Sequence, residues 1–201
     1  FALEEAVCAL EGGYRSIAVP SGLAAITLVL ESFLKHGDHV LVSDSIYQPT
    51  RRYCDGNLKA NGIETTYYDP LIGAGISELI RPNTKLIFVE APGSLTFEIQ
   101  DIPAIADAAH KKGVLVAMDN TWATPLYFKP FEKGVDLSVQ AATKYIVGHA
   151  DAMMGLVTCA TAELWQTVKA HAAAHGLGVG AEEAYLALRG LRTLPVRLER
   201  H

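Results

Sequence analysis

Two side chains, Lys144 and Asp119, have the types and surroundings for complementary chemistry. Lys144 lies in the turn Gln140-Ala-Ala-Thr-Lys-Tyr145, directly after the apolar run 135–139, and Asp119 ends the apolar run 114–118. A lysine amine can bond covalently to an aldehyde, and an acid can keep a ring nitrogen protonated. Pyridoxal phosphate needs both groups, so the pair predicts a site for this cofactor.

Each of the two residues also has an ordinary structural explanation. Most lysines are solvated surface charges, and an aspartate before Asn120-Thr121 can cap a turn. Lys144 acts as a nucleophile only if partial burial or a nearby cation keeps its amine neutral. The prediction therefore depends on both residues meeting in one site.

Three further segments carry groups suited to the same cofactor. Val19-Pro-Ser-Gly22-Leu23 opens a helix, where free N–H groups and the helix dipole favour a phosphate, although Ser21 can equally be a plain helix cap. Thr143, beside the lysine, offers a hydroxyl to phosphate. Tyr47 follows a strand and can stack on a planar ring and transfer a proton, or simply fill the core.

The alternation of short apolar runs with helix-length segments predicts an α/β fold. The apolar runs are continuous, which suits a mostly parallel sheet with helices on both faces. The expected strands are His39–Ser43, Ile63–Tyr68, Lys85–Glu90, Val114–Met118, Leu137–Gln140 and Gly155–Cys159. The expected helices are Gly22–His36, Thr50–Asn61, Ile102–Lys112, Thr161–His175 and Ala181–Gly190.

Four of these strands are followed by residues that could do chemistry. They are the segments Asp44–Tyr47 and Glu90–Ser94 and the single residues Asp119 and Lys144. Ligands of open α/β sheets bind beyond the carboxyl ends of the strands. We therefore expect the four segments to converge on one edge of the sheet.

Composition excludes several classes of protein. The net charge of −5 gives no basic footprint for a nucleic acid, and no apolar run approaches the ~18 residues of a membrane span. Cys8, Cys54 and Cys159 are far apart and form no Cys-x-x-Cys pair, which favours reduced thiols and a cytoplasmic location.

Two short motifs are discounted. Gly176-Leu-Gly-Val-Gly180 resembles a dinucleotide-binding fingerprint, but an alanine-rich helical run precedes it where a strand is required, so we expect a loop between helices. His149-Ala-Asp151 lacks a second ligand pair at workable spacing, so no metal site is predicted.

Several strings together resemble the pyridoxal-phosphate-dependent enzymes of cysteine and methionine metabolism. The likeness extends over essentially the whole chain, and the strings around Asp119 and Lys144 are its specific part. The strings are Gly37-Asp-His-Val-Leu, Tyr68-Asp-Pro-Leu-Ile-Gly-Ala74, Arg81-Pro-Asn-Thr-Lys85, Ala91-Pro-Gly-Ser94, Asp119-Asn-Thr-Trp-Ala123, Gln140-Ala-Ala-Thr-Lys-Tyr-Ile-Val-Gly-His149, Asp151-Ala-Met-Met-Gly155 and Arg189-Gly-Leu-Arg-Thr-Leu194.

The resemblance implies a fold and a set of roles. The fold would be the aminotransferase-like (fold type I) large cofactor-binding domain, extending over residues 1–201. Lys144 would carry the cofactor and move the substrate Cα proton, and Asp119 would pair with the ring nitrogen. Tyr47 would stack on the ring and take part in proton transfer. The phosphate contacts would come from Gly22, Leu23 and Thr143.

The resemblance also implies carbon–sulfur lyase activity on an amino-acid thioether. Ala141 and Ser94 stand where many members have serine and asparagine, and both resemble the β-lyase branch, which converts L-cystathionine to homocysteine, pyruvate and ammonia in methionine biosynthesis. Cystathionine γ-synthase, γ-lyase or cysteine desulfhydrase activity remains an alternative. A catalytically silent binding or regulatory relative is a third reading, against which the intact Lys144, Asp119 and Tyr47 argue.

The two ends of the chain suggest a fragment. The sequence opens at Phe1 without methionine and closes in the polar helical run Leu194–His201. In the family, an N-terminal segment of the neighbouring subunit gives a tyrosine and an arginine to the phosphate, and a C-terminal domain gives an arginine to the substrate carboxylate. We expect both regions to be absent here, and the resemblance implies a homotetramer of active dimers.

Overall fold

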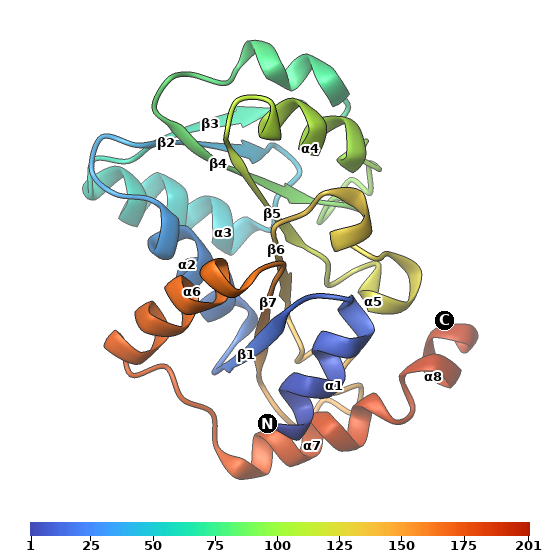
Figure 1. Ribbon diagram of the computed structural model, residues 1–201. Coiled ribbons are helices and arrows are strands. Elements are labelled where there is room, and N and C mark those ends of the chain that lie inside the picture. Colours follow the sequence, from blue (N-terminus) through green and yellow to red (C-terminus); the bar gives the residue numbers. More distant parts are fainter.

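A seven-stranded sheet runs through the middle of the protein, with helices on both faces (Figure 1). The computed structural model describes residues 1–201. In spatial order the sheet is β1-β7-β6-β5-β4-β2-β3, and β2 to β6 pair in parallel. The strands are β1 (Arg15–Val19), β2 (His39–Ser43), β3 (Glu64–Tyr68), β4 (Thr84–Glu90), β5 (Leu115–Asp119), β6 (Leu137–Gln140) and β7 (Gly155–Cys159). The predicted α/β class with a mostly parallel sheet is confirmed.

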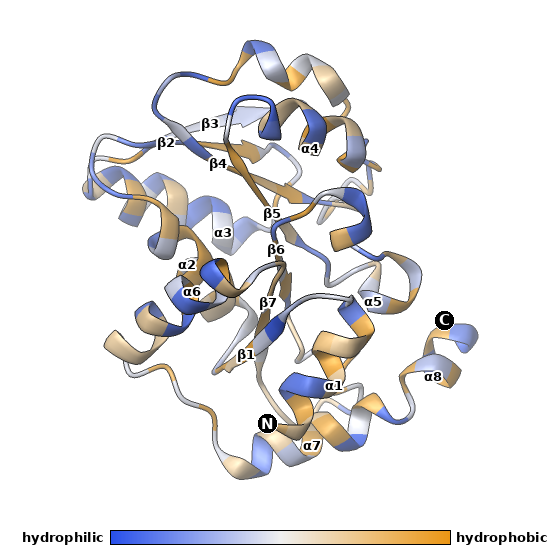
Figure 2. Cartoon of the chain, in the orientation of Figure 1, coloured by the Kyte–Doolittle hydropathy of each residue, from blue (hydrophilic) through white to orange (hydrophobic).

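The central strands are apolar on both sides because helices cover both faces of the sheet. In β4, Leu86 and Phe88 belong to one core, whereas Ile87 and Val89 belong to the core on the opposite face. Figure 2 accordingly shows the central strands in hydrophobic colours. Continuous apolar runs are the expected signature of a parallel sheet buried in this way.

The helices divide between the two faces. On one face α2 (Gly22–Phe33) and α6 (Ala162–Ala174) pack on the sheet and on each other, beside α3 (Gln48–Tyr53). On the other face lie α4 (Ile102–His110) and α1 (Ala2–Glu11). The remaining helices are the short α5 (Thr124–Tyr127), then α7 (Ala181–Leu191), which packs on α1, and α8 (Leu194–Arg200). None of the helices has the length and apolar character needed to cross a membrane.

Three features differ from the expected elements. Helix α1 and strand β1 are not among the elements expected from the sequence. Strand β1 is an edge strand that begins with the exposed Arg15. The helix expected at Thr50–Asn61 begins earlier, because Pro49 occupies its first turn, and α3 passes into a π-helical segment, Cys54–Leu58. The glycine-rich segment 176–180 does connect α6 and α7, as expected.

Strand β7 runs antiparallel to both of its neighbours, and this reversal builds the site edge. The start of β7 therefore lies beside the end of β6, with Leu156 opposite Gln140. It also lies beside the end of β1, with Gly155 opposite Val19. As a result, the start of α2, which follows β1, reaches the edge where β2 to β6 end.

A buried acid joins α1 to the end of β6. Glu11 is 1% exposed, and its Oε1 accepts a hydrogen bond of 2.6 Å from Nε2 of Gln140. Burial raises the pKa of Glu11 to about 7. The folded state therefore holds a proton that the unfolded state has lost above its ordinary pKa near 4.5.

The Glu11→Gln substitution should remove a pH dependence of stability. With the folded pKa raised, the stability contribution of Glu11 is complete below about pH 4.5 and is lost as the pH rises towards 7. The loss is about 3 kcal/mol, at about 1.4 kcal/mol per pKa unit. Urea unfolding of the holoenzyme between pH 5 and 8 should show this decline for the wild type relative to Glu11→Gln. The control Glu5→Gln, an exposed acid in the same helix, should parallel the wild type; an equal decline in Glu11→Gln would contradict the assignment.

Candidate active site

Asp119 occupies the carboxyl end of β5 as a nearly isolated buried acid. Asp119 is only 5% exposed, and its Oδ1 accepts a hydrogen bond of 3.0 Å from the backbone N–H of Thr121. Thr121 is the only residue of the chain that donates a hydrogen bond to this carboxylate. Burial raises the pKa of Asp119. A cationic N–H donor would reverse this effect and supply the missing partner, because it favours the charged form.

Glu90 lies next to Asp119, at the end of β4. The two residues are partners in the parallel ladder, so their side chains project from the same face of the sheet. Burial, with the nearby charge of Asp119, raises the pKa of Glu90 to about 9. Glu90 is therefore neutral at pH 7, and the pair avoids two adjacent buried charges.

Glu90 also positions Tyr47. Its Oε2 accepts a hydrogen bond of 2.8 Å from the backbone N–H of Tyr47, which links the loop after β2 to the end of β4. Tyr47 is 41% exposed, so a ligand at this edge can contact its side chain. The structure thus brings Tyr47 to the edge that holds Asp119.

Lys144 lies in a turn that follows β6, and β6 is the strand next to β5, which ends at Asp119. The turn is closed by a hydrogen bond of 2.9 Å from the N–H of Lys144 to the carbonyl of Ala141. A second bond joins this turn to the segment after β5, since the N–H of Ala141 donates to Oγ1 of Thr121 at 2.7 Å. Thr121 therefore bonds to Asp119 through its N–H and to the lysine turn through its hydroxyl. The side chain of Lys144 is exposed to solvent.

Thr143 already has two partners within the chain. Its hydroxyl donates to the carbonyl of Met154 at 3.1 Å and accepts from the N–H of Met154 at 2.9 Å. These bonds tie the lysine turn to the segment that enters β7. To donate a hydrogen bond to the phosphate, as predicted, this hydroxyl would have to give up its hydrogen bond to the Met154 carbonyl.

The start of α2 is packed against this same turn. Ser21 caps the helix by accepting the N–H of Ala24 at 3.0 Å, whereas the N–H groups of Gly22 and Leu23 have no acceptor in the chain. A Cβ on Gly22 would lie 2.5 Å from Cβ of Ala141, closer than real Cβ contacts allow. Ser21 can therefore cap the helix while the free N–H groups bind a phosphate, as predicted. Because Gly22 has no side chain, the start of α2 can pack closely against Ala141.

These observations fit pyridoxal phosphate. An acid with unused hydrogen-bonding capacity, two free helix-terminal N–H groups, an exposed aromatic side chain and an exposed lysine amine all lie along one sheet edge. The cofactor needs a partner for its ring nitrogen, an anion site for its phosphate, a stacking surface and an amine. The four segments that the sequence analysis expected to converge do so.

A separate pocket lies beside the site, and none of the residues predicted to bind the cofactor lines it. It has a volume of about 470 Å³ and lies beyond the ends of β2 and β3. Its lining residues are Asp44, Tyr67, Tyr68, Asp69, Pro70, Leu71 and Glu98. We therefore do not place the cofactor there.

Glu90 and Thr121 connect the candidate groups; Glu90 was expected at this edge of the sheet without a specific role, and Thr121 only as part of a turn after Asp119. Glu90 carried a usable signal, because it is an acid that ends an otherwise apolar strand, as Asp119 is. For Thr121, the local bond to Asp119 is the turn cap that the sequence suggested, whereas its bond to Ala141 depends on the loops after β5 and β6 lying side by side.

The chain belongs to the Cys/Met metabolism PLP-dependent enzyme family, whose model matches residues 1–201. A Rhizobium johnstonii protein, provisionally named a cystathionine β-lyase, is 55% identical over 200 residues, which are 100% of this chain and 50% of that protein. The cystathionine β-lyase of Haemophilus influenzae is 47% identical over 203 residues, 100% of this chain and 51% of that enzyme.

The fold agrees with this membership. The crystal structure of cystathionine γ-lyase from Lactobacillus plantarum, complexed with L-serine, matches with a TM-score of 0.94 and 35% identity. The match covers 96% of this chain and 51% of that one. The chain thus spans about half the length of the relatives it matches.

Proposed function

We propose that the protein is a pyridoxal-phosphate-dependent carbon–sulfur lyase that cleaves L-cystathionine to homocysteine, pyruvate and ammonia. The observation that carries this proposal is that Asp119 ends β5, while the turn that carries Lys144 follows the adjacent strand β6, and Thr121 bonds to both. Residues 1–201 would form the large cofactor-binding domain, and the resemblance places the remaining substrate contacts outside them.

Each group of the site has a distinct task in this proposal. Bound pyridoxal phosphate supplies an electron-withdrawing ring that stabilises negative charge at the substrate Cα. Lys144 Nζ holds the cofactor in place and accepts the Cα proton, which it can return to a later position. Asp119 keeps the ring nitrogen protonated, and Tyr47 covers the ring and assists proton transfer. The phosphate is held by Gly22, Leu23 and Thr143.

The choice of β-cleavage over γ-cleavage is supported by two kinds of likeness. Identity to the cystathionine β-lyase of Haemophilus influenzae is 47%, compared with 35% to the solved γ-lyase. Ala141 and Ser94 are the residues that distinguish the β-lyase branch in the sequence analysis. Ser94 donates its N–H to the carbonyl of Ser45, so it lies close to the loop of Tyr47.

Product identification tests the proposal. Purified holoenzyme given L-cystathionine should release pyruvate and homocysteine in equal amounts, and 2-oxobutyrate should be a minor product. Predominant 2-oxobutyrate with cysteine would mean γ-cleavage and would refute β-elimination as the main reaction. The ratio of pyruvate to 2-oxobutyrate must be measured, because one methylene group in a binding pocket changes substrate selectivity by only ~1–3 kcal/mol.

The further properties follow from family membership and composition. We propose an amino-acid thioether as the substrate, a cytoplasmic location, and a homotetramer built from active dimers. Cys8, Cys54 and Cys159 are free thiols, and burial raises the pKa of each, which suits a reducing compartment. Light scattering of the full-length holoenzyme measures the oligomeric state.

A further inference from the structure

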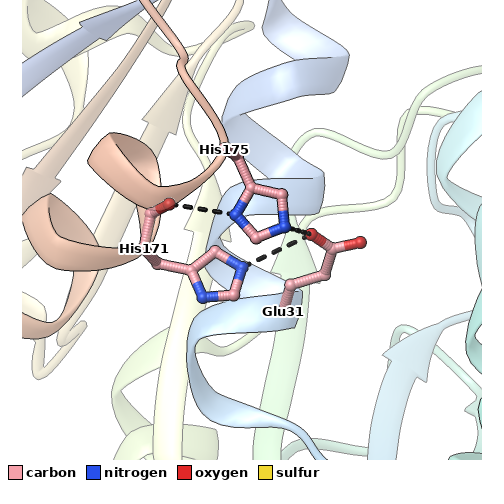
Figure 3. Close-up of side chains that lie close together, drawn as sticks. All are labelled: Glu31, His171 and His175. Carbon is pink, nitrogen blue, oxygen red and sulfur yellow. Dashed lines mark hydrogen bonds and ion pairs between the residues drawn. The ribbon is translucent and has the colours of Figure 1, made fainter.

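Two histidines and a glutamate converge on the face of the protein formed by α2 and α6 (Figure 3). His171 lies in the last turn of α6, His175 is the C-cap residue four positions later, and Glu31 projects from α2. The candidate ligand atoms of the three side chains all lie within 4.8 Å of one another. Residues at i and i+4 share a helix face, so the helix itself directs both imidazoles to one place.

The glutamate is oriented for this role by a fourth residue. The hydroxyl of Tyr53 donates a hydrogen bond to Oε1 of Glu31. The other oxygen, Oε2, faces Nε2 of His171 at 3.4 Å and Nε2 of His175 at 3.8 Å. One oxygen is thus held by Tyr53, and the other faces the two imidazoles.

The tautomer of His175 directs a ring lone pair towards Glu31. Its Nδ1 lies 3.0 Å from the backbone carbonyl of His171, which only accepts, so Nδ1 carries a proton (Figure 3). In the neutral ring Nε2 then presents a lone pair to the lone pairs of Glu31 Oε2. Either a proton or a metal ion must lie between them.

The distances between the ligand atoms are compatible with a bound zinc ion. Zinc bonds to imidazole nitrogen and carboxylate oxygen are about 2.0–2.2 Å long, so tetrahedral ligand atoms lie about 3.4 Å apart. The separation of His171 Nε2 from Glu31 Oε2 has this value, and His175 Nε2 is only slightly farther away. An Nδ1–H bonded to a backbone carbonyl is also the usual outer support of a zinc-bound histidine.

We propose that Glu31, His171 and His175 form a binding site for a divalent transition-metal ion of the Zn²⁺ type. The three side chains are 35%, 27% and 49% exposed, so solvent can supply the fourth ligand. The ion joins α2 to α6. Helix α2 begins at the candidate phosphate site, so a bound ion also stabilises the position of the helix that carries this site. The site is separate from the proposed chemistry and does not depend on it.

Zinc binding to the holoenzyme tests the site directly. Tag-free protein, kept reduced with a phosphine and stripped with a chelator, is titrated with ZnCl₂ against a chromogenic competing chelator. We expect one strongly bound Zn²⁺ per chain. Because loss of an outer support alone weakens zinc sites by about 10–100-fold, His175→Ala and Glu31→Gln should each weaken binding by at least about tenfold.

His110→Gln is the matched control. His110 also faces a carboxylate, that of Asp136 at 2.9 Å, but has no third ligand atom, so zinc affinity should not change. Thermal melting gives a second readout, since an ion that binds only the folded state raises the melting temperature. Zinc should raise it in the wild type and in His110→Gln, but not in His175→Ala. Wild-type protein that binds no zinc, or that binds it as tightly after His175→Ala and Glu31→Gln, would overturn the proposal.

Discussion

Replacing Lys144 with alanine is expected to lower kcat/KM for cystathionine cleavage by at least about 10³-fold. A positioned general base alone contributes about 10²–10⁴-fold, and the substitution also removes the covalent attachment of the cofactor. The side chain is exposed on a turn whose hydrogen bonds are made by the backbone. The variant should therefore keep the fold and lose the chemistry.

Borohydride reduction separates these two roles of Lys144. In the wild type, reduction should attach one cofactor per chain to the peptide that contains Lys144, as seen by mass spectrometry. The Lys144→Ala protein should show no attachment at any lysine. Lys111→Ala, at an exposed surface lysine paired with Asp107, should behave as the wild type in both assays. Retention of the lyase rate in Lys144→Ala would remove this residue from the mechanism.

The Asp119→Asn substitution is expected to lower kcat/KM by about 10²–10⁴-fold. The change keeps the shape of the side chain and removes its charge, so the ring nitrogen of the cofactor loses its counter-ion. Breaking a buried ion pair costs about 3–5 kcal/mol. At about 1.4 kcal/mol for each tenfold change in rate, that cost gives the expected range.

Two comparisons make the Asp119 result specific. Asp107→Asn removes an exposed acid on α4 and should leave kcat/KM unchanged within error. Glu90→Gln should cost much less than Asp119→Asn, within about tenfold, because the raised pKa of Glu90 already makes that residue neutral at pH 7. If Glu90→Gln proved as damaging as Asp119→Asn, the roles assigned to the two acids would have to be exchanged.

Most of the sheet was predictable from the sequence because buried parallel strands have a distinctive composition. The boundaries of β2, β6 and β7 agree with the expected ones, those of β3 and β4 differ by one residue at the start, and β5 is shifted by one residue at both ends. The edge strand β1 was missed. It begins with the polar residues Arg15 and Ser16, so only three apolar residues carry the signal that marks the other strands.

The sequence by itself determined the alternation of strands and helices, and it placed Asp119 and Lys144 just beyond the ends of strands. Apolar runs and helix-start residues are local properties, so they can be read along the chain. Only the tertiary structure decided that β7 is reversed, which sets Gly155 beside Val19 and brings the start of α2 to the lysine turn. It alone placed Glu90 beside Asp119, and Glu31 beside two histidines far from it in the sequence. Those contacts depend on strand order and helix packing, which no local pattern encodes.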